Sequence, residues 1–154
     1  MKRTALALCL LLPACGDAGT PGPTPEATFE TVRKAVADRR WGTVFDLLAG
    51  KELERFKRQL DADRSMNEEQ RNELLEELGL SARELDAISP RDYYIRFTEV
   101  RSRAKPELTD RIAKAGIDEV KVDGERAVIT YRTGEKSREM ELARREGLWY
   151  VVRW

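Results

Sequence analysis

The residue best placed to do chemistry in this 154-residue chain is Cys15, which directly follows a run of apolar residues. The surrounding stretch, residues 10–16, reads LLPACGD. The thiolate of a cysteine is a nucleophile, so its surroundings decide whether it reacts. The only other cysteine, Cys9, lies within the apolar run itself. The position of Cys15 at the end of that run is therefore the first feature to explain.

The segment before Cys15 has the three parts of an export signal. Residues 1–3 form a short basic start, residues 5–12 form an apolar core, and Ala14 is a small residue at the expected cleavage site. The apolar core is too short to cross a bilayer, because a spanning helix needs about 20 apolar residues. The sequence therefore predicts that residues 1–14 direct export and are then removed.

Residues 12–15, Leu-Pro-Ala-Cys, resemble the lipobox of bacterial lipoproteins, with Pro13 at a position where Ala, Ser, Thr or Val is usual. The resemblance implies that Cys15 is lipidated and becomes the first residue of a mature protein anchored to a membrane. It also implies a location in the bacterial cell envelope, with the domain in the periplasm or otherwise outside the cytoplasm. An ordinary secretory signal, with Cys15 incidental, is the alternative.

The residues after Cys15 have the composition of a solvated tether. Residues 16–24 read GDAGTPGPT, with three glycines, two prolines and no large apolar side chain. We therefore divide the chain into a signal peptide over residues 1–14, a lipidated cysteine with a flexible tether over residues 15–24, and one domain over residues 25–154. About 130 residues suffice to bury a hydrophobic core.

Composition excludes several classes of function. The chain has no histidine, so Ser-His-Asp and Cys-His catalysis and His-based zinc sites are excluded. Removal of Cys9 with the signal leaves Cys15 as the only thiol, which rules out an intramolecular disulfide. The chain has 28 basic and 28 acidic side chains, and loss of Lys2 and Arg3 with the signal leaves a formal charge of −2. That balance gives no support for nucleic-acid binding.

The first part of the domain has the apolar spacing of helices. Thr24 precedes Pro25 as a capping residue, and a helix is expected to about Asp38. A second helix is expected to end at Gly50, a typical C-terminal stop. Further helices are predicted around Leu53–Leu60, after the capping pairs Asn67/Gln70 and Ser81/Glu84, after Ser89-Pro90, and from Pro106 to about Lys114.

After Gly116 the apolar period changes from 3.6 to 2, which predicts strands. Turn signals at Asp123-Gly124, Gly134-Glu135 and Glu146-Gly147 divide this part into four strands of an antiparallel meander. The last strand, LWYVVRW, is apolar on both faces, which favours a curved sheet. The predicted fold class is α+β, with N-terminal helices packed on a curved C-terminal antiparallel sheet.

Two segments resemble NTF2-like domains, which are cone-shaped α+β folds. These are RRWGTVFDLL at residues 39–48 and KVDGERAVITYRTGEKSREMELARREGLWYVVRW at residues 121–154, although the early strand of many members has no counterpart in residues 51–115. The resemblance implies a pocket between the helices and the sheet. It also implies isomerases and dehydratases with an Asp or Glu base as relatives, but no motif transfers such a role to a residue of this chain.

The candidate pocket-lining residues are four aromatic side chains. They are Tyr94, Phe97, Tyr131 and Trp149. Arg132 and Arg153 could meet an anionic ligand, while each of these residues is also compatible with an ordinary structural role. No catalytic residue, metal ligand or cofactor is predicted.

Three hypotheses about function follow. The first is a non-catalytic envelope module that binds a small ligand or an envelope protein. The second is a pocket enzyme of the carboxylate-base type, which would need a buried acid in the cavity. The third is a homodimer formed through the exposed face of the sheet, with Trp149 and Val151 as anchors. The leucine stripe of NEEQRNELLEELG, residues 67–79, could also dock a partner helix.

Overall fold

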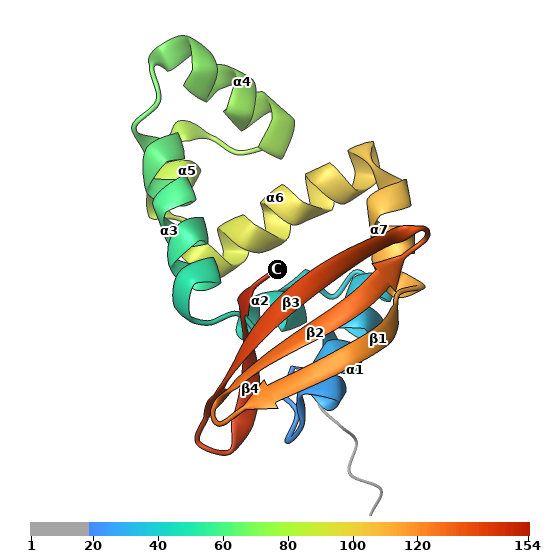
Figure 1. The fold of residues 1–154 in the computed structure, drawn as a ribbon. Helices are drawn as coiled ribbons and strands as arrows, with labels where there is room; N and C mark the ends of the chain where they lie inside the picture. Colours follow the sequence, from blue (N-terminus) through green and yellow to red (C-terminus); the bar gives the residue numbers. More distant parts are fainter. Residues whose placement is uncertain (1–18) are drawn as a thin grey trace, which may run out of the picture.

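The change of period after Gly116 marks the boundary between a helical half and a sheet half (Figure 1). The computed structural model describes residues 19–154. The expected signal peptide, residues 1–14, and Cys15 lie outside the described residues. Within residues 19–154, seven helices precede a four-stranded antiparallel sheet, which confirms the predicted α+β class and the order of its parts.

Side-chain caps fix several of the helix starts. Thr24 accepts a hydrogen bond from the N–H of Ala27 (3.2 Å), and Ser81 forms a complete capping box with Glu84. Asn67 caps through the N–H of Gln70, but the Gln70 side chain bonds the Asn67 side chain rather than its backbone. The helices are α1 (Pro25–Ala37), α2 (Trp41–Asp46), α3 (Gly50–Arg64), α4 (Glu68–Leu78), α5 (Ala82–Ala87), α6 (Pro90–Ala104) and α7 (Pro106–Ala113).

The four strands follow one another in space in the order of the sequence. They are β1 (Gly116–Asp123), β2 (Arg126–Thr133), β3 (Lys136–Arg145) and β4 (Leu148–Arg153), and neighbouring strands pair antiparallel. Two-residue turns join them, and Gly124 adopts a φ of +57° of the kind that such hairpins require. The register shifts in β1 and β3 are irregularities that add twist to the sheet.

One face of the sheet forms the main core with the first two helices. Ile129, Met140 and Val151 are buried on this face, and Phe29 and Val44 are buried on α1 and α2. The opposite face is more polar and carries ion pairs such as that of Arg153 with Glu141 (2.8 Å). Alternation along the strands therefore places one set of side chains inside and the other outside.

The hypothesis of sheet dimerisation named the wrong anchors. Trp149 and Val151 are 4% and 0% exposed and belong to the main core, so neither is available to a second molecule. The half-buried Leu148, Tyr150 and Val152 occupy the other face of β4. The sequence predicted which side chains of β4 share a face, but it did not predict which of the two faces would pack on the helices.

The free edge of β4 is covered by segments from the N-terminal half. Val151 donates a hydrogen bond to the carbonyl of Leu47 (2.9 Å) and accepts one from the N–H of Ala49 (2.8 Å). Trp149 donates to the carbonyl of Gly22 (3.0 Å), and Gly22 is buried. The last part of the expected tether is therefore packed on the domain, and this edge is protected from pairing with other chains.

Gly50 is not the end of the second helix, as was expected, but the start of α3. Helix α2 already ends at Asp46, and residues 47–49 run alongside β4. Gly50 has a φ of +54°, which turns the chain from that extended segment into α3. A glycine can mark either end of a helix, and only the pairing with β4 decides between them here.

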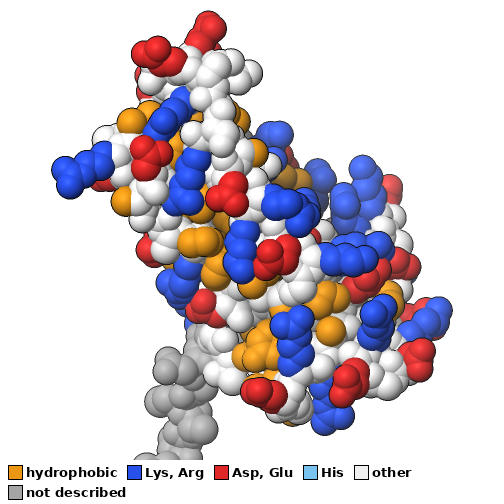
Figure 2. Space-filling model, turned by 90° about the vertical axis from the view of Figure 1, so that its left-hand side faces the viewer, with side chains coloured by type: hydrophobic (Ala, Val, Ile, Leu, Met, Phe, Trp, Pro, Cys, Tyr) orange, Lys and Arg blue, Asp and Glu red, His pale blue; other side chains and the backbone are white. Residues whose placement is uncertain are grey.

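Helices α3 to α6 form a second, smaller core that stands beside the sheet (Figure 1). Leu60, Leu75, Leu78, Leu85 and Tyr93 are buried together in it. The leucine stripe of α4 is thus covered by helices of the same chain, which corrects the suggestion that it docks a partner helix. On the face of the molecule that Figure 2 shows, acidic and basic side chains are mixed, and hydrophobic atoms are visible between them.

Candidate functional site

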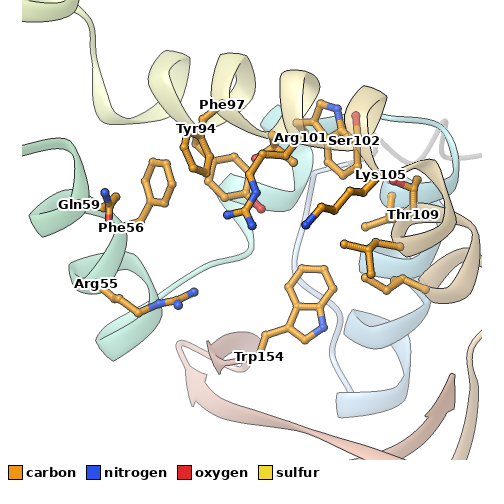
Figure 3. Close-up of a pocket in the computed structure, with 15 residues that line it drawn as sticks. Arg55, Phe56, Gln59, Tyr94, Phe97, Arg101, Ser102, Lys105, Thr109 and Trp154 are labelled. Carbon is orange, nitrogen blue, oxygen red and sulfur yellow. The ribbon is translucent and has the colours of Figure 1, made fainter. Parts of the chain in front are cut away.

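A cavity of about 460 Å³ lies where α3, α6 and α7 meet the C-terminal end of β4 (Figure 3). Its volume is within the range of roughly 300–1,000 Å³ that is typical of small-molecule sites. The described residues that line it are Val36, Trp41, Arg55, Phe56, Gln59, Tyr94, Phe97, Thr98, Arg101, Ser102, Lys105, Leu108, Thr109, Ile112 and Trp154.

Helix α6 contributes the largest share of the cavity wall. Tyr94, Phe97, Thr98, Arg101 and Ser102 recur three or four residues apart, so they lie on one face of the helix. Ser89 caps α6 through the N–H of Asp92 (3.1 Å), and Pro90 occupies its first turn. These two residues fix where the helix begins, and packing of α6 against α2 and α3 decides which of its faces meets the cavity.

An aromatic cluster forms one end of the cavity. The ring of Phe56, on α3, lies edge-on to Tyr94 at 4.9 Å between centroids and edge-on to Phe97 at 6.2 Å. Phe45 also contacts Tyr94, with its ring tilted and 5.5 Å between centroids. Edge-to-face contacts at these distances are favourable for aromatic pairs. The cluster gives the cavity a rigid apolar surface on which a flat molecule could stack.

Three cations and no carboxylate line the cavity. Arg55 pairs with Glu52, on the same helix. Arg101 lies over the ring of Phe97, with 5.3 Å between its guanidinium carbon and the ring centroid. Figure 3 shows Arg101 and Lys105 reaching from the end of α6 toward Trp154. The cavity thus combines an aromatic interior with an electropositive rim.

Some of the polar groups of the wall are donors. Burial raises the pKa of Tyr94, with a smaller opposing effect from Thr98, so its phenol stays protonated at physiological pH. The Nε1 of Trp41 is buried and has no hydrogen-bond partner among the described residues. The Nε1 of Trp154 donates to the hydroxyl of Tyr131 (2.9 Å). None of these groups is a general base.

The four aromatic residues predicted to line a pocket do not all lie in one place. Tyr94 and Phe97 are in the cavity wall. Tyr131 is buried behind it, where its ring packs on Phe29 at 5.2 Å and its hydroxyl holds Trp154. Trp149 is buried in the main core nearer the start of β4. Strand parity places Tyr131 and Trp149 on the inner face but does not tell a pocket from a packed core.

The two arginines suggested as anion contacts are on the surface, away from the cavity. Arg132 pairs with Asp118 (3.3 Å), and Arg153 pairs with Glu141 (2.8 Å). Sequence reasoning missed Arg101, Lys105 and Trp154. The spacing of Arg101 and Lys105, four residues apart at the end of a helix, was a visible signal that both cations share one face.

Two other features of the described residues are weaker candidates for a functional site than this cavity. A more open hollow between α7 and the start of β1 is lined by charges of both signs, including Asp110, Arg111 and Arg132. No cluster of three acidic, cysteine or histidine side chains within residues 19–154 is placed to hold a metal ion. The cavity lined by α6 is therefore the candidate functional site.

Comparisons with known proteins give no relative for this chain. No protein-family model, no curated protein and no solved structure matches it. In the described part of the chain, no helix combines the length and the apolar character needed to cross a membrane.

Proposed function

We propose that this protein is a lipid-anchored module of the bacterial cell envelope that binds a small molecule without transforming it. Cys15 provides the anchor, and the cavity between α3, α6, α7 and Trp154 provides the binding site. The observation that carries the binding proposal is the composition of that cavity, which has an aromatic interior and no carboxylate in its lining.

The same observation weighs against the alternative of a carboxylate-base isomerase or dehydratase. Such an enzyme needs an Asp or Glu that can reach its substrate. The buried acid of the helical core, Asp63, is engaged by Tyr93 and by Gln59 (2.7 Å) and does not line the cavity. The order of helices and strands supports the NTF2-like relationship, whereas the early strand of many members has no counterpart among the helices of residues 50–113.

The position of the tether is compatible with an anchored binding module. Gly22 bonds Trp149 near the start of β4, whereas the cavity is lined by Trp154, beyond the other end of that strand. Five residues of strand separate the two points by about 16 Å. A chain leaving the domain at residues 19–22 therefore need not cover the cavity.

The anchor is tested by Cys15→Ser in cells that export the protein. Membrane fractionation should find the parent in the membrane and the variant in the soluble fraction, and the mass of the N-terminal peptide of the parent should show acyl chains on Cys15. Retention of Cys15→Ser in the membrane to the same degree as the parent would contradict the proposal. So would a native N-terminus upstream of residue 15.

The binding site is tested with naphthalene-2-carboxylate as the probe, by calorimetry on the full chain in the non-ionic detergent dodecyl maltoside. Leu108→Trp adds bulk at the cavity rim and should weaken binding about tenfold or more by displacing the probe. Val122→Trp is the matched control, because Val122 is also an exposed apolar side chain but lies on β1, outside the lining. Equal affinity in all three proteins, or no binding, would contradict the site.

A further inference from the structure

We propose that the ligand of the cavity is an amphipathic anion, a small molecule with a flat apolar body and one carboxylate, sulfonate or phosphate group. The inference rests on the proposed binding function and names the class of ligand. Its apolar body would contact the aromatic cluster of Phe56, Tyr94 and Phe97, and its anionic group would meet Arg101 and Lys105.

Arg101 and Lys105 lie together at the C-terminal end of α6. Lys105 directly follows the last residue of the helix, and its N–H donates to the carbonyl of Arg101 (2.9 Å). Both residues line the cavity, and Figure 3 shows both side chains reaching toward Trp154. Among residues 19–154, no carboxylate lies within ion-pair distance of either cation. Arg55, on the opposite wall, is in contrast paired with Glu52.

Contact with Phe97 gives the Arg101 guanidinium a defined orientation before any ligand arrives. The group lies 5.3 Å from the ring centroid, as in a cation–π contact. Its planar fork then offers two parallel N–H donors, the arrangement that suits a carboxylate or a phosphate. Preorganisation of this kind lowers the entropy lost on binding.

Trp41 does not add a polar contact to this site. The residue is 5% exposed and lines the cavity, but its Nε1 has essentially no accessible surface, so a ligand in the cavity does not reach it. The polar recognition of the ligand is therefore assigned to Arg101 and Lys105.

The test compares naphthalene-2-carboxylate with naphthalene-2-carboxamide, which has nearly the same shape but no charge. Calorimetry on the full chain in dodecyl maltoside should show about tenfold or more tighter binding of the carboxylate, as expected for a charge-assisted hydrogen bond. The double variant Arg101→Gln/Lys105→Gln should lose this preference and keep its affinity for the carboxamide. Arg103→Gln, on α6 but outside the lining, is the matched control and should keep the preference.

The outcomes separate this inference from the proposed function on which it rests. Equal binding of carboxylate and carboxamide, weakened about tenfold or more for both by Leu108→Trp, would overturn the anionic ligand and leave small-molecule binding in place. A preference for the carboxylate that survives in Arg101→Gln/Lys105→Gln would also overturn the role of these two cations. Failure of both probes to bind the parent would overturn both proposals.

Discussion

Tyr93 and Asp63 form the most deeply buried polar contact of the helical core. Tyr93 is 0% exposed and donates its hydroxyl hydrogen bond to Asp63, which is 1% exposed and also accepts from Gln59. Tyr93→Phe would remove a donor from a buried carboxylate and should lower the free energy of unfolding by about 1–3 kcal/mol in urea denaturation. Tyr150→Phe, at a half-buried site on the outer face of the sheet, should change it by less than about 0.5 kcal/mol.

The buried tyrosines make the protein sensitive to alkali. Burial is the largest cause that raises the pKa of Tyr93 and Tyr131, and the carboxylate of Asp63 raises that of Tyr93 further. Above about pH 10 the unfolded chain loses these phenolic protons while the folded protein keeps them, so stability is complete below that pH and falls as the pH rises. Urea midpoints between about pH 8 and about pH 11 should show this loss, with a shallower fall in Tyr93→Phe. An equally steep fall in both proteins would contradict the assignment to Tyr93.

Local signals in the sequence were sufficient to predict most helices and strands. The caps at Thr24, Ser81 and Ser89 and the three hairpin turns depend on residues next to them in the chain, and all were predicted. Gly50 was assigned to the wrong end of a helix, because its role depends on pairing between residues 47–49 and Val151. That contact joins segments about 100 residues apart and leaves no local pattern in the sequence.

Gly50 also yields a prediction for the junction between α2 and α3. Its φ of +54° is costly for any residue with a Cβ, and a Cβ there would lie 3.3 Å from the Cγ1 of Val152. Gly50→Ala should therefore lower the free energy of unfolding by about 1–2 kcal/mol, measured by urea denaturation. Gly116→Ala is the matched control, since an added Cβ meets nothing within 4 Å at the start of β1. Similar stability of the two variants would contradict this account of the junction.

The candidate site exists only in the folded molecule as a whole. Its wall combines Phe56 of α3, Arg101 of α6 and Trp154, which follows β4. Tyr94 and Phe97 were named as pocket candidates through the resemblance to NTF2-like domains, and both lie in the wall. The sequence pattern did not identify Trp154, whose position depends on its hydrogen bond to Tyr131, and it did not distinguish the core residue Trp149 from residues that line the cavity. For a site formed by distant segments, the sequence can indicate residues that share one element, but not which elements come together in the fold.

At the scale of the whole protein, the proposed attachment and binding functions lie at opposite ends of β4. The chain from the proposed anchor joins the domain beside Trp149, and the cavity lies at Trp154. The three tryptophans of the chain therefore report on different places, since Trp41 and Trp154 line the cavity and Trp149 belongs to the main core.

The central claim, that the cavity binds a small molecule, is tested most directly by the three indole N–H signals in ¹⁵N–¹H spectra of the full chain. Titration with naphthalene-2-carboxylate is predicted to shift the signals of Trp41 and Trp154 in step with the binding curve and to leave Trp149 unchanged. Unchanged signals of Trp41 and Trp154 at saturating probe, or a shift confined to Trp149, would contradict it.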